Sequence, residues 1–185
     1  MTEDLFTGNL VRLAVVDLER DPEITAKWMQ DSEFMHLWST RPAHQNGPKP
    51  ERDFFASCLD RMLFFMIHTV EDNRVIGQVS LADLNLTTRN AWLGIGIGDR
   101  ACWGKGYGTE AMQLLLHYAF GQVNLRRVSL EVHEYNTRGI RLYEKLGFQV
   151  EGRERGYLNR FGRRWDMIFM GLLREEWKAK QSNTE

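Results

Sequence analysis

The sequence predicts a mixed α/β domain, in which one central sheet of about seven strands is flanked by about four helices. Three observations support this: strand-like apolar runs fill the middle and the end of the chain, helical patterns separate several of them, and the order is not a regular strand–helix repeat. Such an order favours a sheet that is antiparallel in one half and parallel in the other. The 185 residues fit one domain, with a core over residues 9–173 and a C-terminal tail over residues 174–185.

The first sixty residues predict one strand and two helices. Residues 9–15 alternate in polarity, as a strand does. Asp21-Pro22 marks a helix start, because proline is favoured in the first turn, and this helix extends to about residue 29. Residues 38–50 hold three of the four prolines and predict a loop. A second helix is expected over residues 51–61.

The following residues predict three consecutive strands. The apolar or alternating runs cover residues 63–70, 75–85 and 91–97. Asp72-Asn73 supplies a plausible hairpin turn between the first two runs, because both residue types tolerate turn conformations. This part of the sheet is therefore expected to be antiparallel.

The last third predicts helices and strands in alternation, followed by a hairpin. A strong helical pattern over residues 108–120 precedes a short strand over residues 127–132. Residues 137–146 predict another helix, which Gly147 ends. The final pair of strands is expected at residues 148–157 and 165–172.

Composition excludes several classes of function. The formal charge of -1 argues against bulk electrostatic capture of nucleic acid. The longest strongly apolar run, Met62 to Ile67, is far too short to cross a bilayer, and the first residues have no apolar leader. We therefore expect a cytoplasmic protein with no membrane or nucleic-acid partner. The two cysteines and five histidines lack metal-ligand spacing, so no metal site is expected.

The chemistry begins in a glycine-rich turn between a predicted strand and a predicted helix, Trp103-Gly104-Lys105-Gly106-Tyr107-Gly108-Thr109. Alternate glycines let the backbone adopt positive φ and approach a ligand closely. The helix that follows leaves its first N–H groups unpaired and adds the positive end of its dipole. Together these features predict a site for a diphosphate.

Two nucleotide-binding motifs do not fit this turn. A Walker loop requires G-x-x-x-x-G-K-[ST], and here Gly106 follows Lys105. A dinucleotide fingerprint requires G-x-G-x-x-G, whereas this stretch is G-x-G-x-G. A flexible turn that binds nothing remains open for the heptapeptide taken alone. A nucleotide-binding protein remains open only if the turn holds ATP or NAD despite this spacing.

A second motif covers residues 136–148. Asn136 and Tyr143 are seven residues apart, or two helical turns, so both side chains can face the same side. Taken alone, Asn136 fits a helix N-cap and Tyr143 fits a core aromatic.

The two motifs in this order, separated by one helix and one strand, resemble the Gcn5-related N-acetyltransferase (GNAT) superfamily. The resemblance covers residues 75–148 closely and the first sixty residues poorly. Within the superfamily, Trp-Gly-Lys-Gly-Tyr-Gly-Thr-Glu-Ala is similar to the subgroup of ribosomal-protein N-terminal acetyltransferases. The resemblance implies a sheet that splays between its fourth and fifth strands, with acetyl-CoA in the gap.

The resemblance also implies which residues bind this co-substrate. The turn would bind the diphosphate of CoA through its main-chain amides, and the strand around Gly96 would pair with the pantetheine arm. Asn136 would hydrogen-bond the same arm, and Tyr143 would lie near the thioester sulfur. The full set of expected cofactor-binding residues is Ile95, Gly96, Ile97, Trp103, Gly104, Lys105, Gly106, Tyr107, Gly108, Thr109, Asn136 and Tyr143.

Two residues are expected to be catalytic. Tyr143, with an ordinary pKa of about 10, can protonate a departing thiolate whose conjugate acid has a pKa of about 8.5. Glu131 is the first candidate for the base, with His133 and Asp83 as alternatives. The alternation of its strand also fits Glu131 as a solvent-facing residue. Family members often carry a carboxylate on the fourth strand, where this chain has Trp92-Leu93.

The sequence thus predicts an N-acetyltransferase that moves an acetyl group from acetyl-CoA to a primary amine by direct attack in a ternary complex. The acceptor could be a small-molecule amine or a protein N-terminus, and a homodimer is compatible with the sequence. The acceptor pocket could be lined by Trp28, Phe34, Trp38, Phe54 and Phe55, although aromatics at helical spacing more often belong to the core. Asp31 and Glu33 could hold a cationic amine there or be surface charges. The alternative is a non-catalytic acyl-CoA-binding or sensing domain of the same fold.

Overall fold

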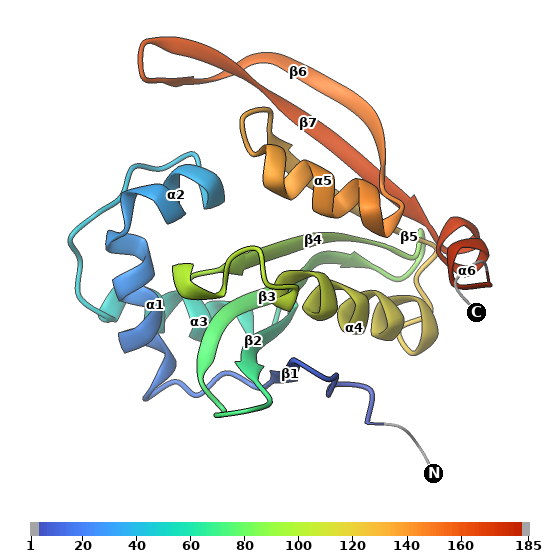
Figure 1. Cartoon of the computed structure of the whole chain (residues 1–185), viewed down its shortest axis with the longest axis horizontal. Helices are drawn as coiled ribbons and strands as arrows, with labels where there is room; N and C mark the ends of the chain where they lie inside the picture. The colour runs from blue at the N-terminus through green and yellow to red at the C-terminus, as the bar shows by residue number, and fades with distance from the viewer. Residues whose placement is uncertain (1–3, 183–185) are drawn as a thin grey trace.

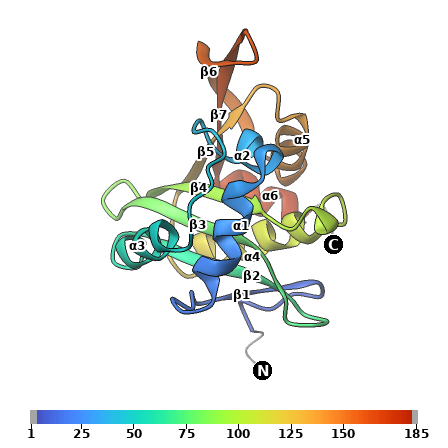
Figure 2. The ribbon, with the colours of Figure 1, turned by 90° about the vertical axis from the view of Figure 1, so that its left-hand side faces the viewer.

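The computed structural model describes residues 4–182 and has one seven-stranded sheet between two groups of helices (Figures 1 and 2). The strand order in the sheet is β1-β2-β3-β4-β5-β7-β6. The strands are β1 (Val11–Ala14), β2 (Leu63–Thr69), β3 (Val75–Asn85), β4 (Asn90–Ile97), β5 (Arg127–His133), β6 (Gln149–Arg160) and β7 (Arg163–Leu173). The helices are α1 (Asp21–Gln30), α2 (Ser32–Trp38), α3 (Lys49–Cys58), α4 (Tyr107–Gly121), α5 (Thr137–Leu146) and α6 (Arg174–Ser182).

The mixed sheet that the sequence predicts is confirmed. The strands β1 to β4 pair antiparallel in chain order, and β5, β7 and β6 form a second antiparallel group. The two groups meet in one parallel pair, β4 with β5. All seven expected strands and all four expected helices are present, and most of their ends differ from expectation by three residues or fewer.

Two helices were not predicted from the sequence, α2 and α6. Helix α2 has seven residues, and its N-cap Asp31 accepts hydrogen bonds from the backbone N–H groups of Glu33 and Phe34 at 2.9 and 3.2 Å. Helix α6 lies in the expected tail, and its single buried side chain, Trp177, packs on Phe120. Short helices with one or two buried residues carry too little periodicity to be recognised.

The expected splay between β4 and β5 is confirmed. The two strands pair only over Asn90–Trp92 and Arg127–Ser129. Beyond Trp92, β4 keeps β3 on one side and has no strand on the other within the part of the chain that the structure describes. Its remaining residues, through Ile97, therefore present main-chain N–H and C=O groups to a gap in the sheet.

The hairpin of β6 and β7 is longer than expected and turns at Phe161-Gly162. The φ angles of these two residues are 54° and 70°. Positive φ at both central residues is typical of a two-residue type I′ turn, whose twist matches that of the strands. Because β5 pairs with β7 only from Met167 onward, the hairpin projects beyond the end of β5 (Figure 1).

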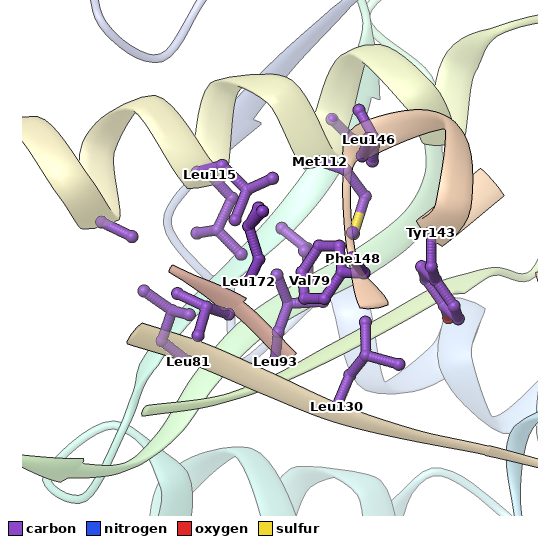
Figure 3. Close-up of a cluster of buried hydrophobic side chains, with 14 of the residues drawn as sticks. Val79, Leu81, Leu93, Met112, Leu115, Leu130, Tyr143, Leu146, Phe148 and Leu172 are labelled. Atoms are coloured by element: carbon purple, nitrogen blue, oxygen red, sulfur yellow. The ribbon is translucent and has the colours of Figure 1, made fainter. Parts of the chain in front are cut away.

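Two buried clusters, one on each face of the sheet, hold these elements together. Figure 3 shows the larger cluster, in which Val79 and Leu93 of the sheet lie close to Leu115 of α4. Tyr143 of α5 lies at the margin of this cluster. The smaller cluster joins α1, α2 and α3 to β2 and the start of β3. The sheet that contains the splayed part of β4 thus lies between two packed layers.

Candidate active site

The glycine turn has the backbone geometry that the sequence predicts. Gly104 and Gly106 have φ angles of +74° and +92°, a region that side chains other than glycine's rarely adopt. Gly106 is the N-cap of α4, and no side chain caps this helix end. The N–H groups of Tyr107, Gly108 and Thr109 have no acceptor among residues 4–182. Three amides and the helix dipole therefore converge on one point.

A cavity of about 450 Å³ connects this turn with the unpaired edge of β4 and with α5. We call it the cofactor cavity. Its charged lining residues, Arg138 and Lys145, are both cationic, and none of the described acidic residues lines it. The guanidinium of Arg138 stacks on Trp103 at 3.9 Å from the ring centroid. The Trp103 indole N–H donates to the carbonyl of Ile97 at 2.7 Å, which fastens the turn to the end of β4.

Most of the expected cofactor-binding residues lie around this cavity. The lining includes Ile95, Gly96, Ile97, Trp103, Gly104, Gly106, Gly108, Thr109, Asn136 and Tyr143. The side chains of Lys105 and Tyr107 are not part of the lining: Lys105 is exposed, and Tyr107 packs against the core. These two residues can contribute only their main-chain amides.

Arg138 and Lys145 were not singled out from the sequence, although a signal for them exists. Together with Leu142 they lie at positions i, i+4 and i+7 of α5, so one helix face carries all three. The spacing of two helical turns that placed Asn136 and Tyr143 on one side also places Arg138 and Lys145 on one side. A cationic stripe beside a diphosphate turn is the pattern to look for.

Asn136 has both of the roles that the sequence allowed. Its Oδ1 accepts a hydrogen bond from the backbone N–H of Gly139 at 2.9 Å, which makes it the N-cap of α5. The same side chain lines the cofactor cavity and a second, neighbouring cavity. Its Nδ2 donates no hydrogen bond within the described chain, so the amide can serve a ligand.

Tyr143 also lies where the two cavities meet. Its side chain is 8% exposed and packs on Phe148, with 6.0 Å between ring centroids. Burial raises the pKa of Tyr143 to about 12. No residue among 4–182 hydrogen-bonds its hydroxyl. The phenol is therefore protonated at neutral pH and available as a donor.

The second cavity, of about 620 Å³, lies between β3, β4, β5 and the loop after α2. We call it the acceptor cavity. Its lining holds two carboxylates, Asp83 and Glu131, and neither lysine nor arginine among the residues that the structure describes. Asp83 lies at an irregularity of the β3–β4 pairing and has a φ of 50°. The aromatic lining residues are Trp38, Trp92, Tyr143, Tyr157 and Phe169.

Glu131 and His133 have shifted pKa values in this cavity. Burial, followed by the neighbouring Glu154, raises the pKa of Glu131, although its side chain still reaches solvent. Burial, followed by the charge of Arg160, lowers the pKa of His133 to about 4. His133 is 5% exposed, and its Nε2 is buried with no hydrogen-bond partner. The neutral imidazole of His133 adds no positive charge at neutral pH, so the carboxylates set the sign of the charge in this cavity.

Other residues considered for the acceptor pocket have different positions. Phe34 lines the cofactor cavity, and Trp38 lines both cavities. Trp28, Phe54 and Phe55 line neither and belong to the smaller cluster or its surroundings. Asp31 and Glu33 pair with Arg100 outside the cavities. Of the two roles left open for these carboxylates, that of surface charges fits their ion pairs with Arg100.

Within residues 4–182 no three His, Cys, Asp or Glu side chains form a group that could hold a metal ion. No described helix is both long enough and apolar enough to span a bilayer.

Comparison with known proteins identifies the family. An acetyltransferase (GNAT) domain matches residues 12–149. An uncharacterized N-acetyltransferase p20 of Bacillus licheniformis is 31% identical over 180 residues, which are 95% of this chain and 98% of that protein. A candidate ribosomal N-acetyltransferase of Bacillus subtilis (strain 168), YdaF, is 32% identical over 110 residues, 60% of each chain.

A solved structure shows the same fold. Spermidine N-acetyltransferase from Vibrio cholerae, crystallised with CoA and spermine, superposes with a TM-score of 0.81 at 23% identity, covering 92% of this chain and 99% of that one. The chain described here belongs to the GNAT family. It is an acetyl-CoA-dependent N-acetyltransferase.

Proposed function

We propose that the enzyme acetylates a primary amine that carries a second positive charge, as in a diamine or polyamine. One observation supports this above the others: two cavities with opposite charge meet at Tyr143. The cationic cavity suits the anionic co-substrate acetyl-CoA, and the anionic cavity suits a cationic acceptor. The Vibrio cholerae relative bound to spermine is consistent with such an acceptor.

On the cofactor side, the amides of Tyr107, Gly108 and Thr109 would bind the diphosphate. Arg138 and Lys145 would add charge-assisted contacts to phosphate oxygens. The unpaired edge of β4 would pair with the amides of the pantetheine arm, as an added strand does. With the diphosphate at the turn, the thioester reaches the opposite end of the cavity, beside Tyr143.

On the acceptor side, Glu131 and Asp83 would bind the cationic groups of the amine. Trp92 is 39% exposed and faces Phe169 edge-on at 6.3 Å, so an aromatic face is available for a cation–π contact. Because the pKa of His133 is about 4, its neutral ring does not repel a cation at pH 7. A monoamine would use only part of this surface.

The transfer itself needs few groups. The neutral amine nitrogen forms a bond to the thioester carbonyl carbon, and the carbon–sulfur bond then breaks. The proton that the nitrogen loses as the amide forms passes through water to the departing thiolate. A main-chain N–H of β4 near Ile95 would stabilise the oxyanion. Tyr143 would donate a hydrogen bond to the sulfur as its charge develops. Full proton transfer from a phenol of pKa about 12 to a thiolate of pKa about 8.5 is uphill by about 5 kcal/mol, so the hydrogen bond is the main contribution.

The candidates for the base, His133 and Glu131, have pKa values shifted in opposite directions. A primary ammonium has a pKa of about 10.4, so transfer of its proton to His133 is uphill by about 9 kcal/mol. The carboxylate of Glu131, whose pKa is raised, is a better acceptor than an ordinary carboxylate. We propose that Glu131 holds the ammonium and accepts its proton, directly or through water.

The unpaired thiols of Cys58 and Cys102 support action in the cytoplasm.

A second acceptor class is a protein N-terminus, which the likeness to YdaF favours. An α-amine has a pKa of about 8, so it needs less help from a base. Release of free CoA thiol, measured with butylamine, 1,4-diaminobutane, spermidine and a peptide with a free α-amine, separates the classes. The proposal predicts that kcat/KM for the diamine exceeds that for butylamine by at least about tenfold. Equal values for these two, or a preference for the peptide, would overturn it.

A further inference from the structure

Five residues line both cavities and form the junction between them: Leu37, Trp38, Ile95, Asn136 and Tyr143. Because the diphosphate turn lies at one end of the cofactor cavity, the acyl group must reach this junction. Any acyl carbon beyond the carbonyl therefore has to share the junction with these side chains.

The indole of Trp38 lies directly on the glycines of β4. A Cβ atom at Gly96 would be 2.8 Å from Cε3 and 2.9 Å from Cζ3 of Trp38. A Cβ atom at Gly94 would lie 4.0 Å from Cη2 of the same ring. Gly94 and Gly96 are two residues apart on one strand, so they share a face of the sheet. The absence of side chains there makes room for the indole in the gap where the sheet splays.

Two contacts keep Trp38 in this position. The ring of Phe34 stacks on it, with 5.9 Å between centroids and 16° between planes. Arg160, at the tip of the β6–β7 hairpin, donates to the backbone carbonyls of His36 at 2.8 Å and of Ser39 at 3.0 Å. Arg160 thus holds the main chain on both sides of Trp38. We call these two hydrogen bonds the Arg160 clasp.

We infer that Trp38 limits the length of the acyl group, so that acetyl-CoA is preferred over acyl-CoAs with longer chains. The indole of Trp38 occupies the space over Gly94 and Gly96, and the amine in the ternary complex would occupy the acceptor cavity beyond the junction, so added methylenes would have to displace one of the two. A pocket wall of this kind discriminates by about 10- to 200-fold for each methylene that it excludes. Gly94 and Gly96 then have a second role besides their place beside the co-substrate, because they leave room for the indole of Trp38.

The test compares acetyl-, propionyl- and butyryl-CoA with one fixed amine, whichever the enzyme uses. Wild-type enzyme should strongly prefer acetyl-CoA. Trp38→Ala should raise the ratio of kcat/KM for butyryl-CoA to that for acetyl-CoA by at least about tenfold, and Trp38→Phe should raise it less. Phe54→Ala is the control, because the aromatic side chain of Phe54 is 41% exposed and lines neither cavity, so its loss should leave the ratio unchanged.

A second variant tests the clasp without touching the wall. Arg160→Ala should raise the same ratio in the same direction by a smaller factor, while Arg163→Ala, which alters a stack on Trp165, should not. Equal rates with butyryl- and acetyl-CoA in wild-type enzyme would overturn the inference. So would an unchanged ratio in folded Trp38→Ala or, if that variant does not fold, in Trp38→Leu. Since every assay uses one amine, a wrong proposal about the acceptor would not affect the result.

Discussion

Replacement of Tyr143 by phenylalanine removes one oxygen atom from the junction of the two cavities. The ring stays packed on Phe148, and the hydroxyl that is lost has no hydrogen-bond partner in the described chain. We therefore expect the free energy of unfolding to change by less than about 1 kcal/mol, or to rise slightly. Binding of acetyl-CoA should also change little.

The rate of transfer should fall. A hydrogen bond to a charged group contributes about 1.5–3 kcal/mol, which corresponds to about 10- to 150-fold in rate. General acid catalysis with full proton transfer would contribute about 10²- to 10⁴-fold, but the pKa of about 12 makes that transfer uphill. The expected loss in Tyr143→Phe is therefore in the lower range, at 10- to 150-fold.

The assay is single-turnover release of the CoA thiol at saturating amine, because product release can hide the chemical step in kcat. Thermal unfolding and acetyl-CoA titration of the same sample serve as controls. A single-turnover rate within twofold of wild type would refute the assignment of Tyr143. A loss well above 10³-fold would contradict the hydrogen-bond account and favour full proton transfer.

Three further variants test the turn, the base and the buried histidine. Gly106→Ala places a side chain at a φ of +92°, which costs about 1–2 kcal/mol. The Kd for acetyl-CoA, measured by calorimetry, should therefore rise about tenfold. Gly121→Ala is the control and should bind acetyl-CoA normally, because the space around its Cβ is open. Glu131 attracts a cation only when ionised, so kcat/KM for the amine should rise with pH through the raised pKa of Glu131. In Glu131→Gln this rise on the acidic side of the pH–rate profile should disappear. If the rise persists, Glu131 has no role in the mechanism. The pKa of His133 is about 4 in the folded chain and about 6.5 in the unfolded chain. As the pH falls, the unfolded chain therefore binds the proton at a higher pH than the folded chain does. The stability present above pH 6.5 is lost as the pH falls toward 4, so the free energy of unfolding decreases. Denaturant unfolding should show about 2 kcal/mol of this loss between pH 7 and pH 5 in wild type and less in His133→Gln; equal losses would place the effect elsewhere.

The parts that the sequence predicted are those with local signals. The glycine turn needs positive φ at Gly104 and Gly106, and only the residue type is required to see it. Asn136 and Tyr143 share a helix, so spacing alone placed them together. The seven strands and their mixed pairing follow from runs and turns that lie close in the chain.

The parts that it did not predict depend on contacts between distant residues. Arg160 bonds the carbonyl of His36 across 124 positions of the chain, and nothing near Arg160 indicates that partner. Trp38 at the end of α2 meets Gly96 of β4, although α2 itself has too few buried residues to show a period. The alternation of apolar and polar residues in β5 fits Glu131 either as a surface residue or as a site residue. Its place in the acceptor cavity depends on the splay of β4 away from β5.

The central claim is that main-chain amides of the glycine turn hold the diphosphate of acetyl-CoA. Hydrogen–deuterium exchange of residues 104–109 tests it directly, with and without saturating CoA, and with pantetheine as the control that lacks phosphates. The account predicts strong protection of the amides of Tyr107, Gly108 and Thr109 by CoA and little protection by pantetheine. Bound CoA with unchanged exchange in this turn and new protection elsewhere would contradict it.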